Sequence, residues 1–168
     1  NHESYMDIPV FFAAVTNKQH GFVAKKSLAS LPVFGRWIEE IRSVFIERDD
    51  PRASIRAIDE GIGLLRQGFS LVIFPEGSRS GGRGMGEFKK GALRLATKPG
   101  APIVPVTLQG SRQVFEEKGR LQKGCRVRVF IHPHIKTAGL SKQEAGAVSD
   151  AVEGLIREKL DEWRQQNG

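Results

Sequence analysis

The sequence predicts an α/β fold of one domain, with a mostly parallel central sheet flanked by helices. Helical and strand-like patterns alternate along the chain, which is typical of parallel strands joined by crossover helices. The run SLVIF at residues 70–74 is short, apolar and β-branched, as expected for a strand buried on both faces. The length of 168 residues suits a single domain and is sufficient to bury a core.

The first 50 residues predict one helix followed by two strands. Ser4 is the predicted N-cap of a helix that runs through Ala13, with an acidic residue three positions after the cap. Strands are predicted at residues 21–24 and 43–47.

A clear amphipathic helix comes next, and Gly68 is predicted to end it. Its apolar face is formed by residues at helical spacing: Ile55, Ile58, Ile62 and Leu65. After the 70–74 strand, the pattern predicts a helix at about residues 88–97 and a buried strand at residues 102–108.

The C-terminal third predicts one further strand and a final helix. Residues 126–132 alternate basic and apolar side chains, which indicates an edge or half-exposed strand. Ser141 and Glu144 form a capping box at the start of the helix. The helix carries an apolar stripe that we expect to pack on the core: Val148, Val152, Leu155 or Ile156, Leu160 and Trp163.

The composition indicates an anionic partner and excludes several classes of protein. The formal net charge is +7, which favours nucleic acid, anionic lipid or phosphorylated substrates, while a solvated basic surface remains the alternative. The single cysteine, Cys125, excludes an internal disulfide. The histidines and the cysteine lack zinc-type spacing, so no metal is expected. The longest apolar run, residues 8–15, is far shorter than the roughly 20 residues of a membrane-spanning helix.

A glycine-rich basic loop follows the 70–74 strand at residues 75–84, PEGSRSGGRG. Ligand sites in α/β sheets gather beyond the carboxyl ends of strands, and glycines let backbone N–H groups approach an anion. Residues 76–94 contain five basic and two acidic side chains, a net charge of +3. The ending of a Walker loop is absent. The loop therefore predicts a phosphate site, while a flexible surface loop remains the alternative.

The first seven residues, NHESYMD, place His2 and Asp7 five positions apart. On one straight helix these side chains would point about 140° apart. They can meet if His2 precedes the helix and Asp7 lies in its first turn, which leaves one ring nitrogen as a base. A structural histidine and an aspartate that stabilises the helix dipole explain the same residues, and the spacing alone favours that simpler interpretation. No serine or cysteine has a nucleophile motif, so a catalytic His2 would act on a substrate hydroxyl.

Four short blocks occur in order along residues 1–108: NHESYMD, VFIERDD, FPEGSRS and PIVPVTL. Together they resemble the glycerolipid acyltransferase family, of the bacterial 1-acylglycerol-3-phosphate O-acyltransferase type. In the second block Glu47 stands where the family more usually has aspartate, and in the third Ser78 replaces threonine; both keep the chemical group. The resemblance implies that one acyltransferase domain spans residues 1–168. Because the chain begins without methionine, it also implies a membrane-docking segment ahead of Asn1.

The resemblance implies a specific chemistry for the opening residues. His2 would be the general base on the free hydroxyl of a lysophospholipid, most directly 1-acylglycerol-3-phosphate, and Asp7 would orient and charge it. The acyl donor would be acyl-CoA or acyl-carrier protein, with no metal or other cofactor. Arg79 would hold the acceptor's phosphate. The implied substrate-binding residues are Glu76, Gly77, Ser78, Arg79, Arg48 and Lys25.

The lipid substrates predict an enzyme at the cytoplasmic face of the cell membrane, where a basic face is drawn to anionic headgroups. A non-catalytic module that binds anionic lipid explains the charge equally well, but does not explain why His2 and Asp7 lie in this context. No nucleic-acid partner is expected, because few aromatic residues lie near the basic ones and no recognition motif is present. For the acyltransferase interpretation, we expect a His2 ring nitrogen within hydrogen-bond reach of Asp7, at the mouth of a cleft shared with Glu76 and Arg79.

Overall fold

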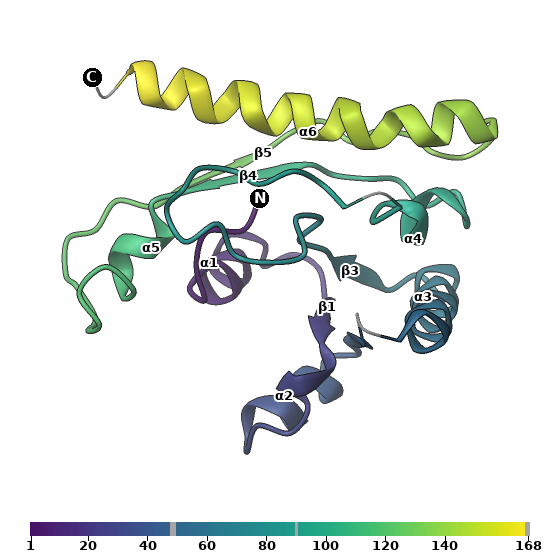
Figure 1. Cartoon of the computed structure of the whole chain (residues 1–168), viewed down its shortest axis with the longest axis horizontal. Coiled ribbons are helices and arrows are strands. Elements are labelled where there is room, and N and C mark those ends of the chain that lie inside the picture. Colours follow the sequence, from purple (N-terminus) through teal and green to yellow (C-terminus); the bar gives the residue numbers. More distant parts are fainter. Residues whose placement is uncertain (48–49, 90, 167–168) are drawn as a thin grey trace.

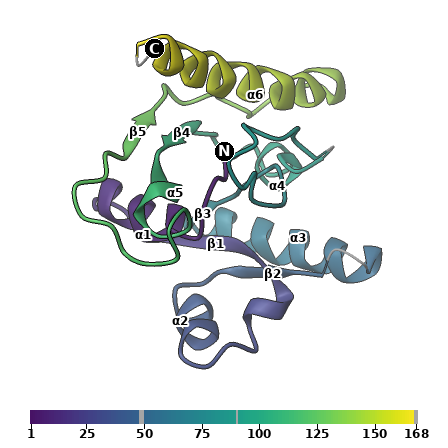
Figure 2. The same ribbon diagram turned by 60° about the vertical axis from the view of Figure 1, so that its left-hand side comes forward.

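The computed structural model describes residues 1–47, 50–89 and 91–166. Its elements are stacked in layers, with the long helix α6 (Lys142–Gln165) along one side and helix α2 (Phe34–Glu40) at the opposite end (Figure 1). Two β-sheets lie between these helices (Figure 2). In the described part of the chain, no helix combines the length and the apolar content needed to cross a bilayer.

The central sheet is parallel, as predicted, and has three strands. Strand β1 (His20–Lys25) lies between β2 (Val44–Ile46) and β3 (Ser70–Val72). A 3-10 turn (Lys26–Leu28) and α2 connect β1 to β2, and helix α3 (Pro51–Arg66) lies between β2 and β3 in the chain. Such crossovers are what parallel neighbours require. All three strands predicted before residue 75 are therefore present.

A second sheet consists of two antiparallel strands, β4 (Val106–Gln109) and β5 (Arg128–Ile131). The strand predicted at residues 102–108 is thus only partly correct. It begins late because Pro105 has no N–H to donate to a ladder. The half-exposed strand predicted in the C-terminal third is confirmed as β5. Helix α5 (Ser111–Val114) follows β4 after one residue.

Helix α3 has a side-chain cap at its start and ends just before the glycine that was predicted to end it. The Asp50 carboxylate caps it by accepting hydrogen bonds from the N–H groups two and three residues on, at 2.9 and 3.0 Å. Gly68 lies just beyond its end with φ of +88°, a backbone conformation that favours glycine. The predicted apolar face is only partly buried, since Ile62 is 3% exposed and Ile55 is 60% exposed.

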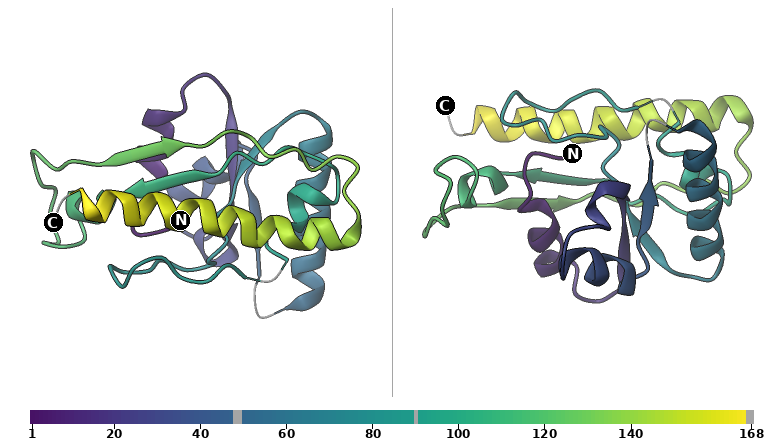
Figure 3. Two further views of the ribbon diagram at one scale, coloured as in Figure 1. Left: turned by 90° about the horizontal axis from the view of Figure 1, so that it is seen from above. Right: turned by 60° about the horizontal axis from the view of Figure 1, so that its bottom comes forward.

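Helix α6 confirms both the predicted capping box and the predicted apolar stripe. Viewed from above, it crosses over the β4–β5 sheet (Figure 3). Ile156 is the buried member of its pair, because Leu155 is 36% exposed. The stripe packs against Phe88 and Leu93 in one apolar cluster. The buried residues of the stripe are Val148, Val152, Ile156, Leu160 and Trp163.

The helix predicted at residues 88–97 is mostly wrong, since among the described residues of this range only α4 (Arg94–Thr97) is helical. The backbone N–H of Phe88 donates to the Glu153 carboxylate on α6 at 3.1 Å, and Phe88 itself is buried in the α6 cluster. Gly91 has φ of +79°, which no right-handed helix contains. Docking against α6 therefore replaces the first helical turns that the local pattern favoured.

Candidate active site

The segment before helix α1 (Asp7–Ala14) is not helical and curls around the Asp7 carboxylate. The prediction that Ser4 is the N-cap is wrong, because the cap position belongs to Met6. Asp7 Oδ2 accepts hydrogen bonds from the backbone N–H groups of Glu3, at 2.8 Å, and Ser4, at 3.0 Å. Such side-chain acceptors compete with the helical hydrogen-bond pattern for backbone N–H groups. The Ser4 hydroxyl oxygen instead accepts the Met6 N–H at 2.9 Å.

His2 and Asp7 are in direct contact. Nδ1 of His2 lies 2.6 Å from Oδ2 of Asp7, which confirms the predicted contact between the two side chains. The Asp7 side chain is fully buried and that of His2 is 16% exposed. The imidazole stacks on Phe74, with ring centroids 4.0 Å apart. Because Nδ1 is held by the carboxylate, Nε2 is the ring nitrogen left to exchange a proton with a substrate.

The Asp7 carboxylate has hydrogen-bond partners on both oxygens. Oδ2 faces three donors, which are the His2 ring and the N–H groups of Glu3 and Ser4. Oδ1 lies 2.5 Å from the Ser111 hydroxyl oxygen. Hydrogen bonds to a buried carboxylate are strong and directional, so they hold it in one orientation. Its negative charge stabilises the protonated imidazole that forms whenever His2 accepts a proton.

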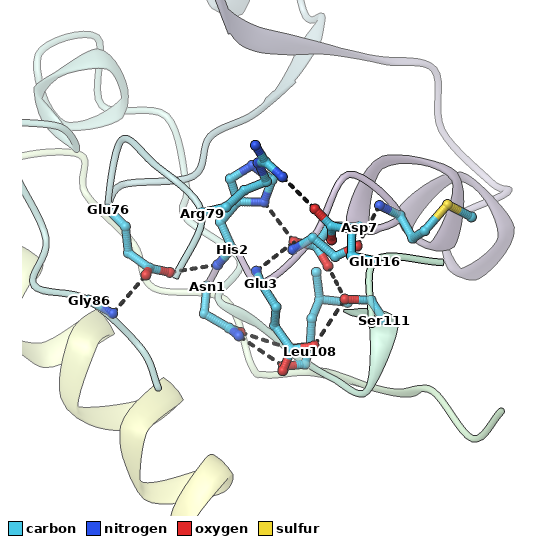
Figure 4. A network of polar contacts seen from close by, with 12 residues as sticks. Asn1, His2, Glu3, Asp7, Glu76, Arg79, Gly86, Leu108, Ser111 and Glu116 are labelled. Carbon is cyan, nitrogen blue, oxygen red and sulfur yellow. Dashed lines mark hydrogen bonds and ion pairs between the residues drawn. The ribbon is translucent and has the colours of Figure 1, made fainter. Parts of the chain in front are cut away.

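Two further side chains attach the opening segment to β4 and the turn after it (Figure 4). The Asn1 amide donates to the Leu108 carbonyl and accepts the Leu108 N–H, both at 2.8 Å. Glu3 Oε2 accepts the Gly110 N–H at 3.0 Å. The sequence predicted no role for Asn1 or Glu3. The one available signal was that Asn1 directly precedes His2.

Glu76 joins the loop after β3 to the same segment. Its side chain is buried, and its two oxygens accept the N–H groups of His2, at 2.6 Å, and Gly86, at 2.7 Å. The adjoining turn is closed by a hydrogen bond from the Gly77 N–H to the Phe74 carbonyl at 3.0 Å. Gly77 has φ of +73°, so a side chain there would be strained. The buried carboxylate therefore fixes the loop against the backbone of His2.

The Arg79 guanidinium is held between an acidic and an aromatic side chain. It forms an ion pair with Glu116, and its Cζ lies 3.4 Å from the centre of the Tyr5 ring. Tyr5 lies between His2 and Asp7 in the chain, so this stacking keeps Arg79 near the pair. The Arg79 side chain is 34% exposed, which leaves it accessible to a ligand.

A surface hollow of about 380 Å³ opens along the loop after β3. It is lined by Glu76, Ser78, Arg79, Ser80, Arg83, Gly84, Met85, Gly86, Glu87 and Lys89. Three of these side chains are cationic and two are anionic, which favours an anion. His2 is not part of the lining and reaches the hollow through its backbone bond to Glu76. Glu76 and Arg79 share the hollow as predicted, but the prediction that His2 lies at its mouth is not confirmed, because His2 is absent from the lining.

A family model described as Acyltransferase matches residues 1–109, the part that holds this site. The chain belongs to the acyltransferase family. The fold resembles the crystal structure of the 1-acyl-sn-glycerophosphate acyltransferase PlsC from Thermotoga maritima, with a TM-score of 0.80 and 30% identity. That match covers 98% of this chain and 64% of the Thermotoga chain.

Two curated relatives of this acyltransferase carry 1-acyl-sn-glycerol-3-phosphate acyltransferase names. The chloroplast protein of Arabidopsis thaliana is 35% identical over 96% of this chain and 44% of its own length. The protein of Borreliella burgdorferi is 31% identical over 96% of this chain and 64% of its own length. The chain thus spans about half to two thirds of the length of these relatives.

The remaining predicted binding residues of this acyltransferase are less closely grouped. Ser78 is exposed and lines the hollow. Lys25 ends β1 and is exposed, and none of the described carboxylates forms an ion pair with it. Arg48 lies outside the described residues. Within those residues, no group of three or more His, Cys, Asp or Glu side chains is placed to hold a metal ion.

Proposed function

We propose that this acyltransferase moves a fatty acyl group from acyl-CoA or acyl-carrier protein to the free hydroxyl of 1-acylglycerol-3-phosphate, giving phosphatidate. The observation that carries the proposal is the 2.6 Å contact between His2 and Asp7 beside a basic hollow. The names of the relatives from Arabidopsis, Borreliella and Thermotoga specify the same acceptor class, which supports this choice.

The proposed reaction is a direct transfer between two bound substrates. Nε2 of His2 takes the hydroxyl proton as the acceptor oxygen attacks the thioester carbonyl carbon. A C–O bond forms, the C–S bond breaks, and the departing sulfur takes the proton from His2. Asp7 stabilises the imidazolium in between. The chain's own residues supply the base and the orientation, and the acyl donor is the only co-substrate.

A transfer assay read by mass spectrometry tests the proposal. The purified protein is given 1-acylglycerol-3-phosphate, glycerol-3-phosphate or a neutral lysolipid, each with acyl-CoA and with acyl-carrier protein. We expect phosphatidate from the first acceptor. If product forms only with another of these acceptors, the protein is an acyltransferase of the same family that acts on that acceptor instead. Lipid binding without thioester cleavage would instead identify a non-catalytic anionic-lipid module.

The acceptor's phosphate is proposed to bind at Arg79, where it replaces the Glu116 carboxylate. A phosphate offers the guanidinium paired oxygens and more negative charge than the Glu116 carboxylate, which is bonded to Arg79 through Oε1. Gly77, Ser78, Lys25 and Arg48 remain predicted contributors to the same site.

The Arg79→Ala variant is expected to raise KM for 1-acylglycerol-3-phosphate about 10-fold to 100-fold, because a charge-assisted contact is worth roughly 1.5–3 kcal/mol. The change in kcat is expected to be small, since the contact exists before and during the transfer. Initial rates against acceptor concentration measure both quantities. Arg66→Ala, which removes an exposed arginine at the end of α3, is the matched control. An unchanged KM in Arg79→Ala would place the phosphate elsewhere.

We also propose that the protein works at the cytoplasmic face of the membrane, where its lipid acceptor resides. The segment that leads into α2 carries apolar side chains on the surface, with Val33 82% exposed and Leu31 45% exposed. Val33 also has φ of +65°, which is unfavourable for a β-branched residue. Lys26 and Arg36 nearby in the chain are exposed cations. This combination suits the surface of an anionic bilayer.

The Val33→Asp variant is expected to weaken binding to phosphatidylcholine vesicles that contain phosphatidylglycerol by about tenfold, because it removes an apolar side chain from the bilayer surface. Vesicle sedimentation measures the bound fraction. Ile55→Asp is the matched control, because Ile55 is also largely exposed but lies on α3. Equal losses in both variants, or no loss in either, would contradict the assignment of this segment to the membrane.

A further inference from the structure

Ser111 is buried although it begins a short helix on the surface. Its relative exposure is 0%, whereas Gln113 and Phe115 in the same region are exposed. The turn before it requires a glycine at position 110: the φ of Gly110 is +90°, and a Cβ there would lie 2.4 Å from the Arg126 carbonyl oxygen. The chain therefore turns sharply after β4, and the Ser111 hydroxyl lies against the opening segment.

The Ser111 hydroxyl has two acidic neighbours but only one proton. Its oxygen lies 2.5 Å from Asp7 Oδ1 and 3.0 Å from Glu3 Oε2. The shorter contact identifies Asp7 as the acceptor of that proton. Burial raises the pKa of the Glu3 carboxyl and the charge of Asp7 adds to that rise, while the hydrogen bonds from Ser111 and from the Gly110 N–H oppose it.

Ser111 is also the one partner of Asp7 Oδ1 among the described residues, whereas Oδ2 has three donors. The two oxygens exchange places when the carboxylate rotates about its Cβ–Cγ bond. A donor fixed on Oδ1 opposes that rotation and keeps Oδ2 facing the His2 ring. A buried acceptor left without a donor costs free energy, so this hydroxyl has a defined effect on the pair.

We propose that Ser111 is a positioning residue for the His2–Asp7 pair, acting through a hydrogen bond from its hydroxyl to Asp7 Oδ1. The proposal rests on the proposed function, since it requires His2 to be the base. Ser111 touches no reacting atom in this scheme. It holds the carboxylate that orients the base, and Glu3 in turn holds Ser111.

The test compares Ser111→Ala with Ser43→Ala in the acyl-transfer assay. Ser43 is a matched control, because it is also a buried serine whose hydroxyl oxygen holds one partner, the Phe22 N–H, at 2.8 Å. Both variants lose a buried hydrogen bond and are expected to melt at lower temperature. Only Ser111→Ala is expected to lower kcat, by on the order of 10-fold to 100-fold, with KM for the acceptor unchanged.

Ser111→Cys keeps the shape of the side chain with a weaker donor and is expected to have an intermediate kcat. If Ser111→Ala does not fold, the kcat of Ser111→Cys tests the positioning role in its place. Wild-type kcat in a folded Ser111→Ala, or in Ser111→Cys where the alanine variant does not fold, would overturn the positioning role. An equal loss of kcat in Ser43→Ala would also overturn the positioning role, because the lower kcat would then result from reduced stability of the protein. Absence of transfer by the wild-type protein would overturn the proposed function itself.

Discussion

Replacing His2 with alanine is expected to lower kcat/KM for acyl transfer by about 10²-fold to 10⁴-fold, the range usual for loss of a general base. Nε2 of His2 is the proposed acceptor of the substrate proton, and alanine cannot take it. The fold is expected to persist, because the backbone of His2 keeps both of its bonds. Its N–H donates to Glu76 at 2.6 Å, and its carbonyl accepts the Ser80 N–H at 2.8 Å.

Two measurements separate the loss of the base from a loss of structure. Circular dichroism of His2→Ala is expected to match the wild-type protein, and the melting temperature is expected to fall by no more than in Ser43→Ala, because the variant loses one bond to Asp7 and the stacking on Phe74. His134→Ala, which removes an exposed histidine after β5, serves as the control and is expected to keep full activity. Retained transfer in folded His2→Ala would exclude His2 as the base.

Replacing Asp7 with asparagine is expected to lower kcat by about 10³-fold to 10⁴-fold, by analogy with the same change in a Ser-His-Asp triad. An amide beside Nδ1 removes the charge that stabilises the imidazolium. In the wild-type protein hydrogen-bond donors face both oxygens of Asp7. The asparagine side chain has only one oxygen, so its NH₂ group faces a hydrogen-bond donor in place of the other. Each unsatisfied buried group costs roughly 1–3 kcal/mol, and the variant is therefore also expected to melt at lower temperature.

The comparison that isolates the catalytic effect of Asp7→Asn uses both rate and stability. Asp59→Asn is the matched change on the surface, where the carboxylate pairs with Lys98 and both side chains are 57% exposed. Surface pairs contribute little, so this control is expected to keep activity and stability. A folded Asp7→Asn protein with near-wild-type kcat would show that Asp7 does not orient the base.

Several elements follow from residues close together in the sequence. The Asp50 cap and Gly68 define α3, and the capping box of Ser141 and Glu144 defines the start of α6. Caps and periodic stripes depend on neighbours within about one helical turn, so spacing alone reveals them. The contact between His2 and Asp7 is also local, but the spacing alone favoured a structural histidine, and the ordered blocks of the acyltransferase resemblance predicted the pair.

Other features depend on partners that no local pattern could reveal. The predicted helix at residues 88–97 is shortened because Glu153, 65 positions away, takes the Phe88 N–H. The helix expected from Ser4 starts later for a local reason that the spacing did not reveal, because the Asp7 carboxylate accepts the N–H groups of residues three and four positions before it. In both cases a hydrogen bond from a docked or folded-back side chain overrides a local helical preference.

The sequence by itself determined the class of fold, through alternating helical and strand-like patterns. It also determined the acyltransferase resemblance and the acidic partner of His2, because both depend on short blocks that follow one another in order along the chain. Only the tertiary structure decided what holds that pair in place. Asn1 binds Leu108, and Ser111 approaches Asp7, across separations of 107 and 104 positions. The tertiary structure also pairs Arg79 with Glu116, which lies 37 positions away in the sequence. Such contacts arise when β4 and the turn after it pack against the opening segment, and packing between distant segments leaves no periodicity or spacing in the chain.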